Sequence, residues 1–415
     1  MQSQEKNELK LLALIIILGL ALRLAGGILF PVWSGPEEGA HFVYTKLIGD
    51  NGALPMIPLT KETLASIYNE SIHQPPLFYM IAAVFYLPLA GQDPEFIVHL
   101  LRLLSIAFGT AGIPLTYLIA KRLGFGKTVR LGAAMFIALL PTHIVTSATL
   151  SNSTLSGLFS LGIIYYSIKV LQEKKAIDMA LAGILMAASI MTMFTGLAVA
   201  IAFGIAWVVF LLRGKEVLWK RAIACATPVL GTPVFLRNLA LTGHLFPSYL
   251  RPMVEINGAW LAYFSTHLFA GIWLQEYGTA TIPDYRFVFF GFYAIISLVA
   301  FIGVVRLLPG REWKSAGKKI VAAVLVLPIL LNLAGVAYMN FFGTWPEARW
   351  LFPTIGLAGI LLIAGLISFA EMLGQKARAN ALVWAFLFTL LLLDLVLLVN
   401  YNRVLPDIIW NVPVF

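Results

Sequence analysis

The chain of 415 residues consists of long apolar stretches separated by short polar segments. A helix that crosses a bilayer needs about 20 apolar residues, and stretches of that length recur along the whole chain. They do not alternate in polarity with a period of two, as the strands of an outer-membrane barrel do. The pattern predicts an all-α polytopic membrane protein with about eleven transmembrane helices. The predicted spans are 10–30, 97–120, 131–149, 153–171, 177–194, 196–212, 222–241, 287–308, 320–339, 350–370 and 381–400.

The composition agrees with this class. The chain is 60% hydrophobic and only 12% charged, a balance that a soluble domain does not tolerate. Its formal net charge of +9 does not indicate a nucleic-acid partner, because basic residues in membrane proteins usually report orientation. The single cysteine, Cys225, lies in an apolar stretch, which excludes an intrachain disulfide and a thiolate metal cluster.

The distribution of Lys and Arg predicts the orientation of the helices. Of the 29 basic residues, 20 lie in alternate connections or at the adjoining span ends, so we expect those connections to be cytoplasmic. The N-terminus is then cytoplasmic and the C-terminus lies outside. If the stretch 75–91 crossed the membrane, the basic connection 121–130 would face outward. This stretch has about 16 apolar residues and opens with two prolines, so we expect an interfacial or re-entrant helix on the outer surface.

We expect one transmembrane domain, 1–415, in the plasma membrane, with membrane lipids around it. Two outer segments are long, 31–96 and 242–286, and both mix aromatic residues with sparse charges. This mixture is typical of helices that lie at the level of the lipid headgroups. The first of these segments carries the proposed active site, which therefore faces outward.

Two adjacent acids, Glu37 and Glu38, follow the first span, between Pro36 and Gly39. Adjacent carboxylates repel one another, and desolvation near a membrane raises a carboxyl pKa, so one of them is suited to act as a general base. The alternative is a pair of solvated loop acids. The nearby His41 and the scarcity of other acids in the loop favour a catalytic or ligand-binding role.

Histidines and amides supply the next candidates. His41, His73 and His143 have the chemistry of metal ligands or of hydrogen-bonding partners for a substrate. None shows a short H-x-x-x-H spacing, so each is alternatively a histidine bonded within the protein. His73 and Gln74 belong to the motif HQPP, and Asn152 lies in SNST. All five are predicted to bind substrate.

Three arginines lie at the outer ends of apolar spans: Arg102, Arg237 and Arg349. A guanidinium near hydrocarbon is costly unless it is paired, which favours an anionic partner, and its fork suits a phosphate. Snorkelling to lipid headgroups is the alternative. We predict that the three arginines, together with Asn238 beside Arg237, bind the donor substrate.

The order of the motifs resembles a known superfamily. An apolar span, SGPEEGAH, a loop, HQPPLFY and then HLLRLLSIAFGTAGIPLTYLIAKRLGFG resemble the GT-C glycosyltransferases. The resemblance is to the branch that uses polyprenyl-phosphate sugars, such as protein O-mannosyltransferases and the aminoarabinose transferase acting on lipid A. It covers residues 10–170 and continues through FLRNLALTGHLFP (235–247) and EARWLFPTIGL (347–357).

The resemblance implies an enzyme that moves a sugar from a polyprenyl-phosphate carrier to an acceptor hydroxyl at the outer face, with inversion. The acceptor is a lipid, a glycan or a protein. The base is an acid of the first outer loop, here Glu37 or Glu38, where members commonly carry Asp-Glu. Many members also have an acid where this chain has Asn152. This difference weakens the support for a metal site built from two carboxylates, so the sequence does not decide whether the enzyme uses a divalent metal ion as a cofactor.

Two other classes of function compete with an enzyme. A lipid or sugar transporter, or a flippase, commonly has inverted repeats and charged residues at mid-membrane, and the sequence shows neither clearly. A non-catalytic scaffold is the other alternative. Polar residues gathered at one face favour catalysis there. Since the sequence has no Walker loop and no dinucleotide fingerprint, a transferred group has to come from a donor in the membrane.

Overall fold

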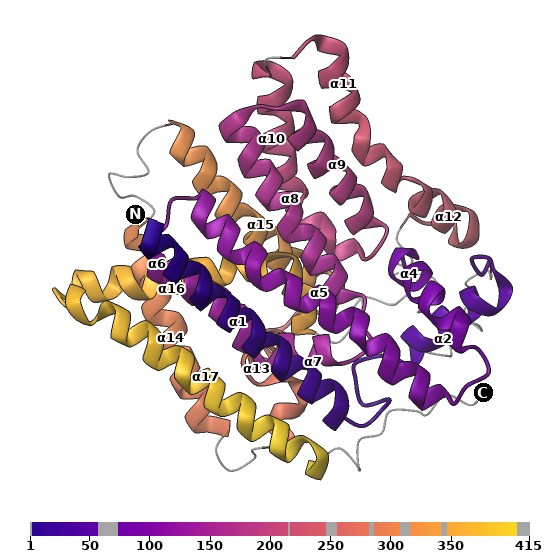
Figure 1. Ribbon diagram of the computed structural model, residues 1–415, viewed down its shortest axis with the longest axis horizontal. Helices are drawn as coiled ribbons and strands as arrows, with labels where there is room; N and C mark the ends of the chain where they lie inside the picture. Colours follow the sequence, from indigo (N-terminus) through magenta and orange to yellow (C-terminus); the bar gives the residue numbers. More distant parts are fainter. Residues whose placement is uncertain are drawn as a thin grey trace.

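The computed structural model describes residues 2–56, 74–214, 216–245, 255–281, 286–307, 316–341 and 347–404. Within these ranges every regular element is a helix (Figure 1). The predicted all-α class is thereby confirmed. The helices, with η marking 3₁₀ turns, are α1 (Gln2–Leu29), α2 (Glu38–Asn51), α4 (Leu77–Tyr86), η2 (Leu87–Leu89), α5 (Pro94–Arg122), α6 (Lys127–Leu139), α7 (Pro141–Ala148), α8 (Ser153–Glu173), α9 (Ala176–Ile190), η3 (Phe194–Val199), α10 (Ala200–Arg213), α11 (Leu218–Ala226), η4 (Thr227–Gly231), α12 (Pro233–Thr242), α13 (Gly258–Thr281), α14 (Arg286–Leu307), α15 (Ala316–Asn340), η7 (Ala348–Leu351), α16 (Phe352–Met372) and α17 (Lys376–Val404).

Within the described part of the chain, nine helical stretches are long and apolar enough to cross a membrane, and a bent pair, α6 and α7, would make a tenth. The chain is thus a multi-pass membrane protein. Of the predicted spans, 177–194 corresponds to α9, which is apolar but only 15 residues long. The count of eleven stays a prediction.

The predicted span 131–149 is not one straight helix. Its two halves, α6 and α7, meet at an angle of 52°. Leu140 is extended (φ −70°, ψ 116°) because it precedes Pro141, whose ring disfavours helical geometry in the residue before it. The bend ends α6 and starts a new helix, α7, whose eight residues are all buried.

Helix α16 lies at the centre of the bundle and packs against α6, α8, α14, α15 and α17. Of its most apolar 18-residue window, 78% is buried. Its crossing with α14 depends on two glycines. A Cβ on Gly303 would lie 1.8 Å from the carbonyl oxygen of Gly365, and a Cβ on Gly365 would lie 2.2 Å from that of Ala300. Only glycine permits the two backbones to approach this closely.

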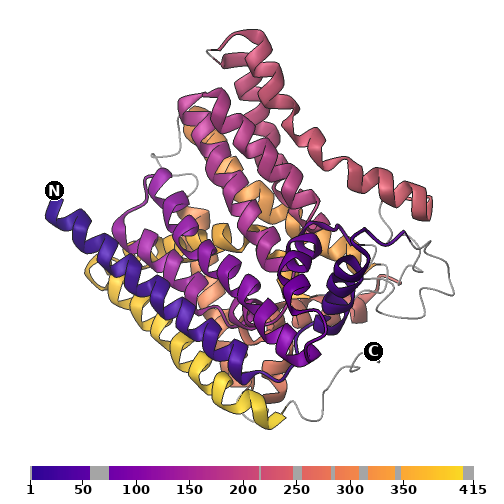
Figure 2. The same cartoon turned by 45° about the vertical axis from the view of Figure 1, so that its right-hand side comes forward.

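The first loop forms a small subdomain at the end of the bundle where α1 ends and α5 begins. Helix α2 packs against α4, and α4 against α5 (Figure 2). A separate apolar cluster, including Phe42, Phe78 and Tyr86, lies between them. Helix α4 has ten residues, too few to cross a bilayer, which agrees with the expectation that 75–91 does not span the membrane.

The second long segment, 242–286, differs from a set of headgroup-level helices in its described residues. Helix α13 packs against α7 and α17. Trp273 is buried and stacks on Tyr293, with 4.6 Å between ring centroids, while Phe136 and Phe386 meet its ring edge-on. Aromatic packing of this kind holds α13 against its neighbours at Trp273.

Candidate active site

The carboxylate of Glu38 is fully buried and accepts four hydrogen bonds. Arg102 donates two of them, from Nε to Oε1 and from Nη2 to Oε2, each at 2.8 Å. The backbone amides of Trp33 and Leu150 donate the other two, each at 2.9 Å. Burial alone would raise the pKa of Glu38, but Arg102 and the two amides together hold that pKa below its ordinary value. Glu38 is thus an ionised anchor that joins the loop to α5 and to the α7–α8 connection.

Arg102 uses all five of its N–H groups within the protein. Besides the two bonds to Glu38, Nη1 donates to the carbonyl oxygens of Gly27 (3.0 Å) and Phe30 (2.8 Å), and Nη2 donates to that of Pro31 (2.9 Å). A guanidinium has five N–H donors, so none is left for a ligand. The predicted donor-binding role of Arg102 does not fit this geometry. Arg102 instead donates hydrogen bonds to the carbonyl oxygens at and just after the end of α1, and pairs with Glu38.

Glu37 differs from its neighbour in both backbone and environment. It lies just before α2 with φ 56° and ψ 20°, in the left-handed region that costs a non-glycine residue of order 1 kcal/mol or more. Trp33, at the start of the same turn, also has a positive φ, of 71°. The side chain of Glu37 is 29% exposed, and its Oε2 lies 3.0 Å from Nη2 of Arg349. Strain of this kind is commonly found at functional sites.

Arg349 lies between two carboxylates. Its Nε donates to Glu347, its Nη2 pairs with Glu37, and its Nη1 donates to the carbonyl oxygen of Pro36 at 3.2 Å. Burial, with the Glu37 charge nearby, raises the pKa of Glu347 above its ordinary value, although Arg349 opposes this. Two of the five N–H groups of Arg349 have no bonded partner among the described residues, so this arginine, unlike Arg102, can still donate to an anion.

A cleft of only about 10 Å³, the space of about one water molecule, lies beside this cluster, between the first loop, α7, α13 and η7. Helix α7 contributes two hydroxyl side chains to it, and η7 contributes the acid and arginine just described. The lining residues are Pro36, Thr142, Thr146, Gly271, Glu347, Ala348 and Arg349.

One turn along α2, His41 begins a second polar cluster. Its Nδ1 lies 2.8 Å from the hydroxyl of Tyr79, and Tyr79 donates to Oε1 of Gln74 at 2.8 Å. Nδ2 of Asn152 donates to the same Gln74 oxygen at 2.7 Å and to the Tyr79 hydroxyl at 3.2 Å. The ring of Tyr44 packs on Tyr79. The structure therefore brings together His41, Gln74 and Asn152, three residues predicted from widely separated motifs.

This network assigns the tautomer of His41. Because the Tyr79 hydroxyl donates to Gln74, it accepts from His41, which places the imidazole proton on Nδ1. Nε2 of His41 then carries a lone pair, is buried, and has no partner among the described residues. Burial lowers the pKa of His41 to about 4, with Glu37 and Glu38 opposing the shift and Arg349 supporting it. The ring is neutral at pH 7 and offers a hydrogen-bond acceptor.

His143 lies apart from these clusters. Its Nδ1 accepts a hydrogen bond of 2.8 Å from Nη2 of Arg23, and its ring stacks on Phe352 with centroids 4.8 Å apart. Arg23, on α1, is fully buried and also donates to the carbonyl oxygens of Ile137 and Ala138. His143 thus has an internal partner, the alternative considered for each histidine.

Two further candidates lie at the edge of the site, and one lies outside the described residues. Nη2 of Arg237 donates to the carbonyl oxygen of Pro55 at 2.7 Å, which places α12 against the first loop. Nδ2 of Asn238 donates to the carbonyl oxygen of Leu245 and stabilises the turn after α12. His73 falls outside the residues that the structure describes.

Sequence reasoning missed three polar residues. In the motif PPLFY, Tyr79 has the pattern of an apolar packing residue. Its place five residues after Gln74, beside two prolines, was a weak signal of a polar role. Glu347 has no sequence signal beyond its place two residues before Arg349 in EARWLFPTIGL. Arg23 resembled a snorkelling residue near the end of the first span.

The described residues include no group of three or more His, Cys, Asp or Glu side chains placed to hold a metal ion. The two carboxylates beside the cleft, Glu37 and Glu347, both pair with the Arg349 guanidinium. This donor set does not fit a divalent cation as it is arranged here.

Comparison with known proteins places the fold. No protein-family model matches the chain, and no curated protein matches its sequence. Solved structures do match. The oligosaccharyltransferase of Archaeoglobus fulgidus in complex with Zn and sulfate aligns with a TM-score of 0.55 and 11% identity, over 94% of this chain and 53% of that one. ArnT from Cupriavidus metallidurans bound to undecaprenyl phosphate aligns with a TM-score of 0.55 and 15% identity, over 96% of this chain and 73% of that one.

The chain has the GT-C fold of these membrane transferases. ArnT in its apo state aligns as well, with a TM-score of 0.55 and 14% identity, over 95% of this chain and 76% of ArnT. The GT-C-like architecture expected from the motifs is thereby confirmed. The chain spans only about half the length of the archaeal oligosaccharyltransferase.

Proposed function

We propose that this protein is a membrane glycosyltransferase that takes a sugar from a polyprenyl-phosphate carrier and passes it to an acceptor hydroxyl. The observation that carries the proposal is Glu37: a partly exposed acid at a strained position, paired with a buried arginine, beside a cleft. The fold supports it, since one structure that shares the fold is ArnT bound to undecaprenyl phosphate.

In the proposed reaction the acceptor oxygen attacks the anomeric carbon of the donor sugar. The bond between that carbon and the phosphate oxygen breaks, and the polyprenyl phosphate leaves with the electron pair. The acceptor proton passes to the carboxylate of Glu37, and the configuration at the anomeric carbon inverts because attack comes from the face opposite the leaving group. General-base assistance of this kind contributes about 10²–10⁴-fold to the rate.

Arg349 is the proposed ligand of the donor phosphate. Its two N–H groups without a described partner are available to phosphate oxygens, and the monoanionic phosphodiester of the donor would compete with Glu37 for the same guanidinium. Donor binding would therefore weaken the Glu37–Arg349 pair and raise the basicity of Glu37 at the moment when a base is needed. Arg237, which holds the far side of the first loop, is a second cation for the donor.

The second polar cluster is the proposed binding site for sugar or acceptor hydroxyls. The buried Nε2 lone pair of His41 accepts a hydrogen bond from such a hydroxyl, while Gln74 and Asn152 hold the Tyr79–His41 pair in place. Glu38 and Arg102 have a positioning role: they fix the turn that carries Glu37.

The test uses the full-length protein purified into proteoliposomes, with a panel of undecaprenyl-phosphate hexoses and pentoses and an extract of cell-envelope acceptors. Transfer of labelled sugar from at least one donor is expected, and Glu37→Gln is expected to lower the rate about 10²–10⁴-fold. Binding of undecaprenyl phosphate alone, measured by thermal stabilisation, should persist in that variant.

Asp50→Asn serves as the matched control, because Asp50 lies on the same helix, is exposed, and pairs with Lys46 and Tyr86, which lie outside the cleft. Transfer at a near wild-type rate by Glu37→Gln, with the control also active, would rule out Glu37 as the base. Movement of intact lipid-linked sugar across the bilayer without any transfer would instead support the transporter alternative.

A further inference from the structure

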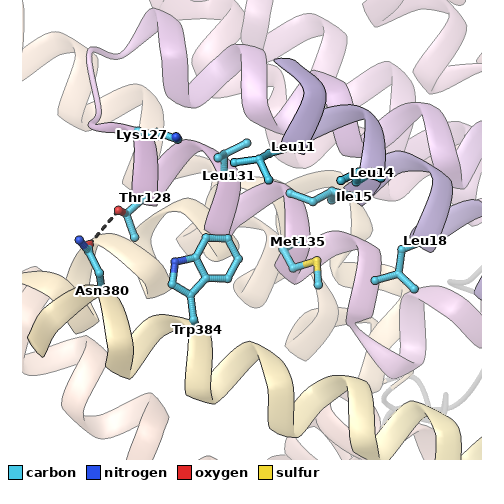
Figure 3. Close-up of a pocket in the computed structure, with 10 residues that line it drawn as sticks. All are labelled: Leu11, Leu14, Ile15, Leu18, Lys127, Thr128, Leu131, Met135, Asn380 and Trp384. Atoms are coloured by element: carbon cyan, nitrogen blue, oxygen red, sulfur yellow. Dashed lines mark hydrogen bonds between the residues drawn. The ribbon is translucent and has the colours of Figure 1, made fainter. Parts of the chain in front are cut away.

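A groove of about 610 Å³ runs between α1, α6 and α17 (Figure 3). One end of it lies at the start of α6 and of α17, on the part of α1 that is far from the first loop. Most of its wall is apolar. Helix α1 contributes Leu11, Leu14 and Leu18, α6 contributes Met135, and the indole of Trp384 closes the α17 side. None of these residues belongs to the proposed catalytic site.

One end of the groove is polar. Thr128 donates to Oδ1 of Asn380 at 2.8 Å, which ties α6 to α17, and the Lys127 ammonium points toward α1 over the same end (Figure 3). Among the described residues no carboxylate pairs with Lys127, and none of the groove's lining residues is acidic. The groove thus combines an apolar wall with a single positive charge at its mouth.

The acids on the neighbouring part of α1 are already neutralised by other cations. Glu5 pairs with Lys121 at 3.0 Å, and Glu8 pairs with Arg130 at 3.2 Å. They leave the charge of Lys127 to an external anion. Lys10, which precedes the first groove-lining residue of α1, adds a second exposed positive charge at this end.

The depth of the groove fits part of one lipid leaflet. From Leu11 to Leu18 the α1 axis rises about 10 Å, and half of a bilayer's hydrocarbon core is about 15 Å thick. The polar end lies where α1 and α17 leave their apolar stretches, which is the level of the lipid headgroups. An acyl chain lying along the wall would therefore place its phosphate near Lys127.

We propose that this groove binds an anionic glycerophospholipid of the leaflet opposite the first loop, with one acyl chain along α1 and the headgroup phosphate on Lys127. Under the topology predicted from the Lys and Arg distribution, this is the cytoplasmic leaflet. Bound there, the lipid bridges α1, α6 and α17, in addition to the Glu8–Arg130 ion pair between α1 and α6 and the Thr128–Asn380 hydrogen bond between α6 and α17. The site stabilises the fold and is independent of the proposed transfer reaction.

The experiment measures thermal unfolding of the delipidated full-length protein in detergent, with dioleoyl phosphatidylglycerol titrated in and dioleoyl phosphatidylcholine as the chain-matched comparison. Phosphatidylglycerol is expected to stabilise the protein at lower concentration, and native mass spectrometry is expected to retain one tightly held molecule. Lys127→Gln should weaken the apparent affinity about fivefold, as expected for one cation at a lipid surface. Lys220→Gln removes an exposed lysine elsewhere and should change nothing.

Filling the groove tests the apolar part. Met135→Trp should abolish the preference for phosphatidylglycerol, and Leu18→Phe provides a smaller change if the first variant does not fold. Three results would overturn the proposal: equal stabilisation by the two lipids, an unchanged affinity in Lys127→Gln, or stabilisation by inorganic phosphate alone to the same extent. The last would identify a free-anion site without a lipid chain.

Discussion

Glu38 and Arg102 form two parallel hydrogen bonds of 2.8 Å at a place where neither side chain is exposed to solvent. The adjacent acid, Glu37, is 29% exposed and pairs with a different arginine. Two neighbouring glutamates of the same charge thus occupy opposite environments, one inside the protein and one at a cleft. This division underlies the first two predictions.

Breaking the buried pair should destabilise the protein. Glu38→Gln leaves Arg102 charged and buried without its partner, so we expect a loss of about 3–5 kcal/mol, seen as a lower melting temperature in detergent. Lys46→Gln is the control, because its ion pair with Asp50 is about 40% exposed and such pairs contribute about 1 kcal/mol or less. Equal melting temperatures for Glu38→Gln and the wild type would contradict an anchoring role.

Glu37→Gln should have the opposite profile. The variant keeps the size of the side chain and a hydrogen bond to Arg349, so its melting temperature should change little. Its transfer rate should fall about 10²–10⁴-fold, because the amide cannot accept the acceptor proton. Paired measurements of melting and turnover on Glu37→Gln and Glu38→Gln separate the roles. A large loss of stability in Glu37→Gln would contradict the separate roles of the two glutamates, because lower turnover could then result from unfolding.

Arg349→Lys should weaken donor binding. Lysine keeps the charge but loses the planar fork, and it cannot contact Glu37, Glu347 and a phosphate in the same way. We expect about 1–3 kcal/mol less favourable binding of undecaprenyl phosphate, measured by titration in detergent. Arg102→Lys should instead lower the melting temperature, with donor affinity retained in the molecules that stay folded. If both variants lost donor affinity alone, the assignment of Arg102 to positioning would fail.

The buried imidazole of His41 predicts a pH dependence of stability. Its pKa falls from 6.5 to about 4 on burial, so between these values the unfolded chain binds a proton that the folded protein does not. Stability should therefore decrease as the pH falls from 6.5 toward 4, by an amount on the order of 3 kcal/mol, and level off below that. Melting curves of wild type and His41→Gln over this range check it, since the difference in slope isolates His41 from the nearby acids.

The predicted topology can be tested by cysteine labelling. With Cys225→Ala as background, Gly126→Cys introduces a thiol at an exposed site where an added Cβ meets no neighbour. An impermeant reagent added to intact cells should leave it unlabelled and should label Gln92→Cys, placed on the expected outer side. Labelling of Gly126→Cys from outside would disprove the predicted orientation.

The sequence was sufficient to predict the helical membrane class and the GT-C-like fold. Apolar length and charge distribution are local properties, and the motifs keep their order along the chain. The pairing of charges was not predictable in the same way. Nothing local indicates that Arg102 belongs to Glu38 and Arg349 to Glu37, because those contacts depend on how α5 and η7 meet the first loop.

The same limit explains the missed residues. The Tyr79 hydroxyl enters the polar cluster because α4 packs against α2 and brings this hydroxyl to His41. The bend between α6 and α7 was marked by Pro141, but apolar content alone favoured one continuous span. A proline at the centre of an apolar stretch is a signal of a helix break or bend, which hydropathy alone does not register.

The pairing of each glutamate with its own arginine also has a consequence for synthesis of the protein. Arg102 is made 64 residues after Glu38, whereas Arg349 contacts the carbonyl of Pro36 from 313 residues further along. An ionised carboxylate is costly to bury without its partner, so the loop cannot close on Glu38 until α5 has emerged. Glu37 cannot pair with Arg349 until the chain has been made as far as η7. A truncated protein would hold the anchor but not the arginine at the cleft, so chain completion itself separates a folded loop from an assembled site.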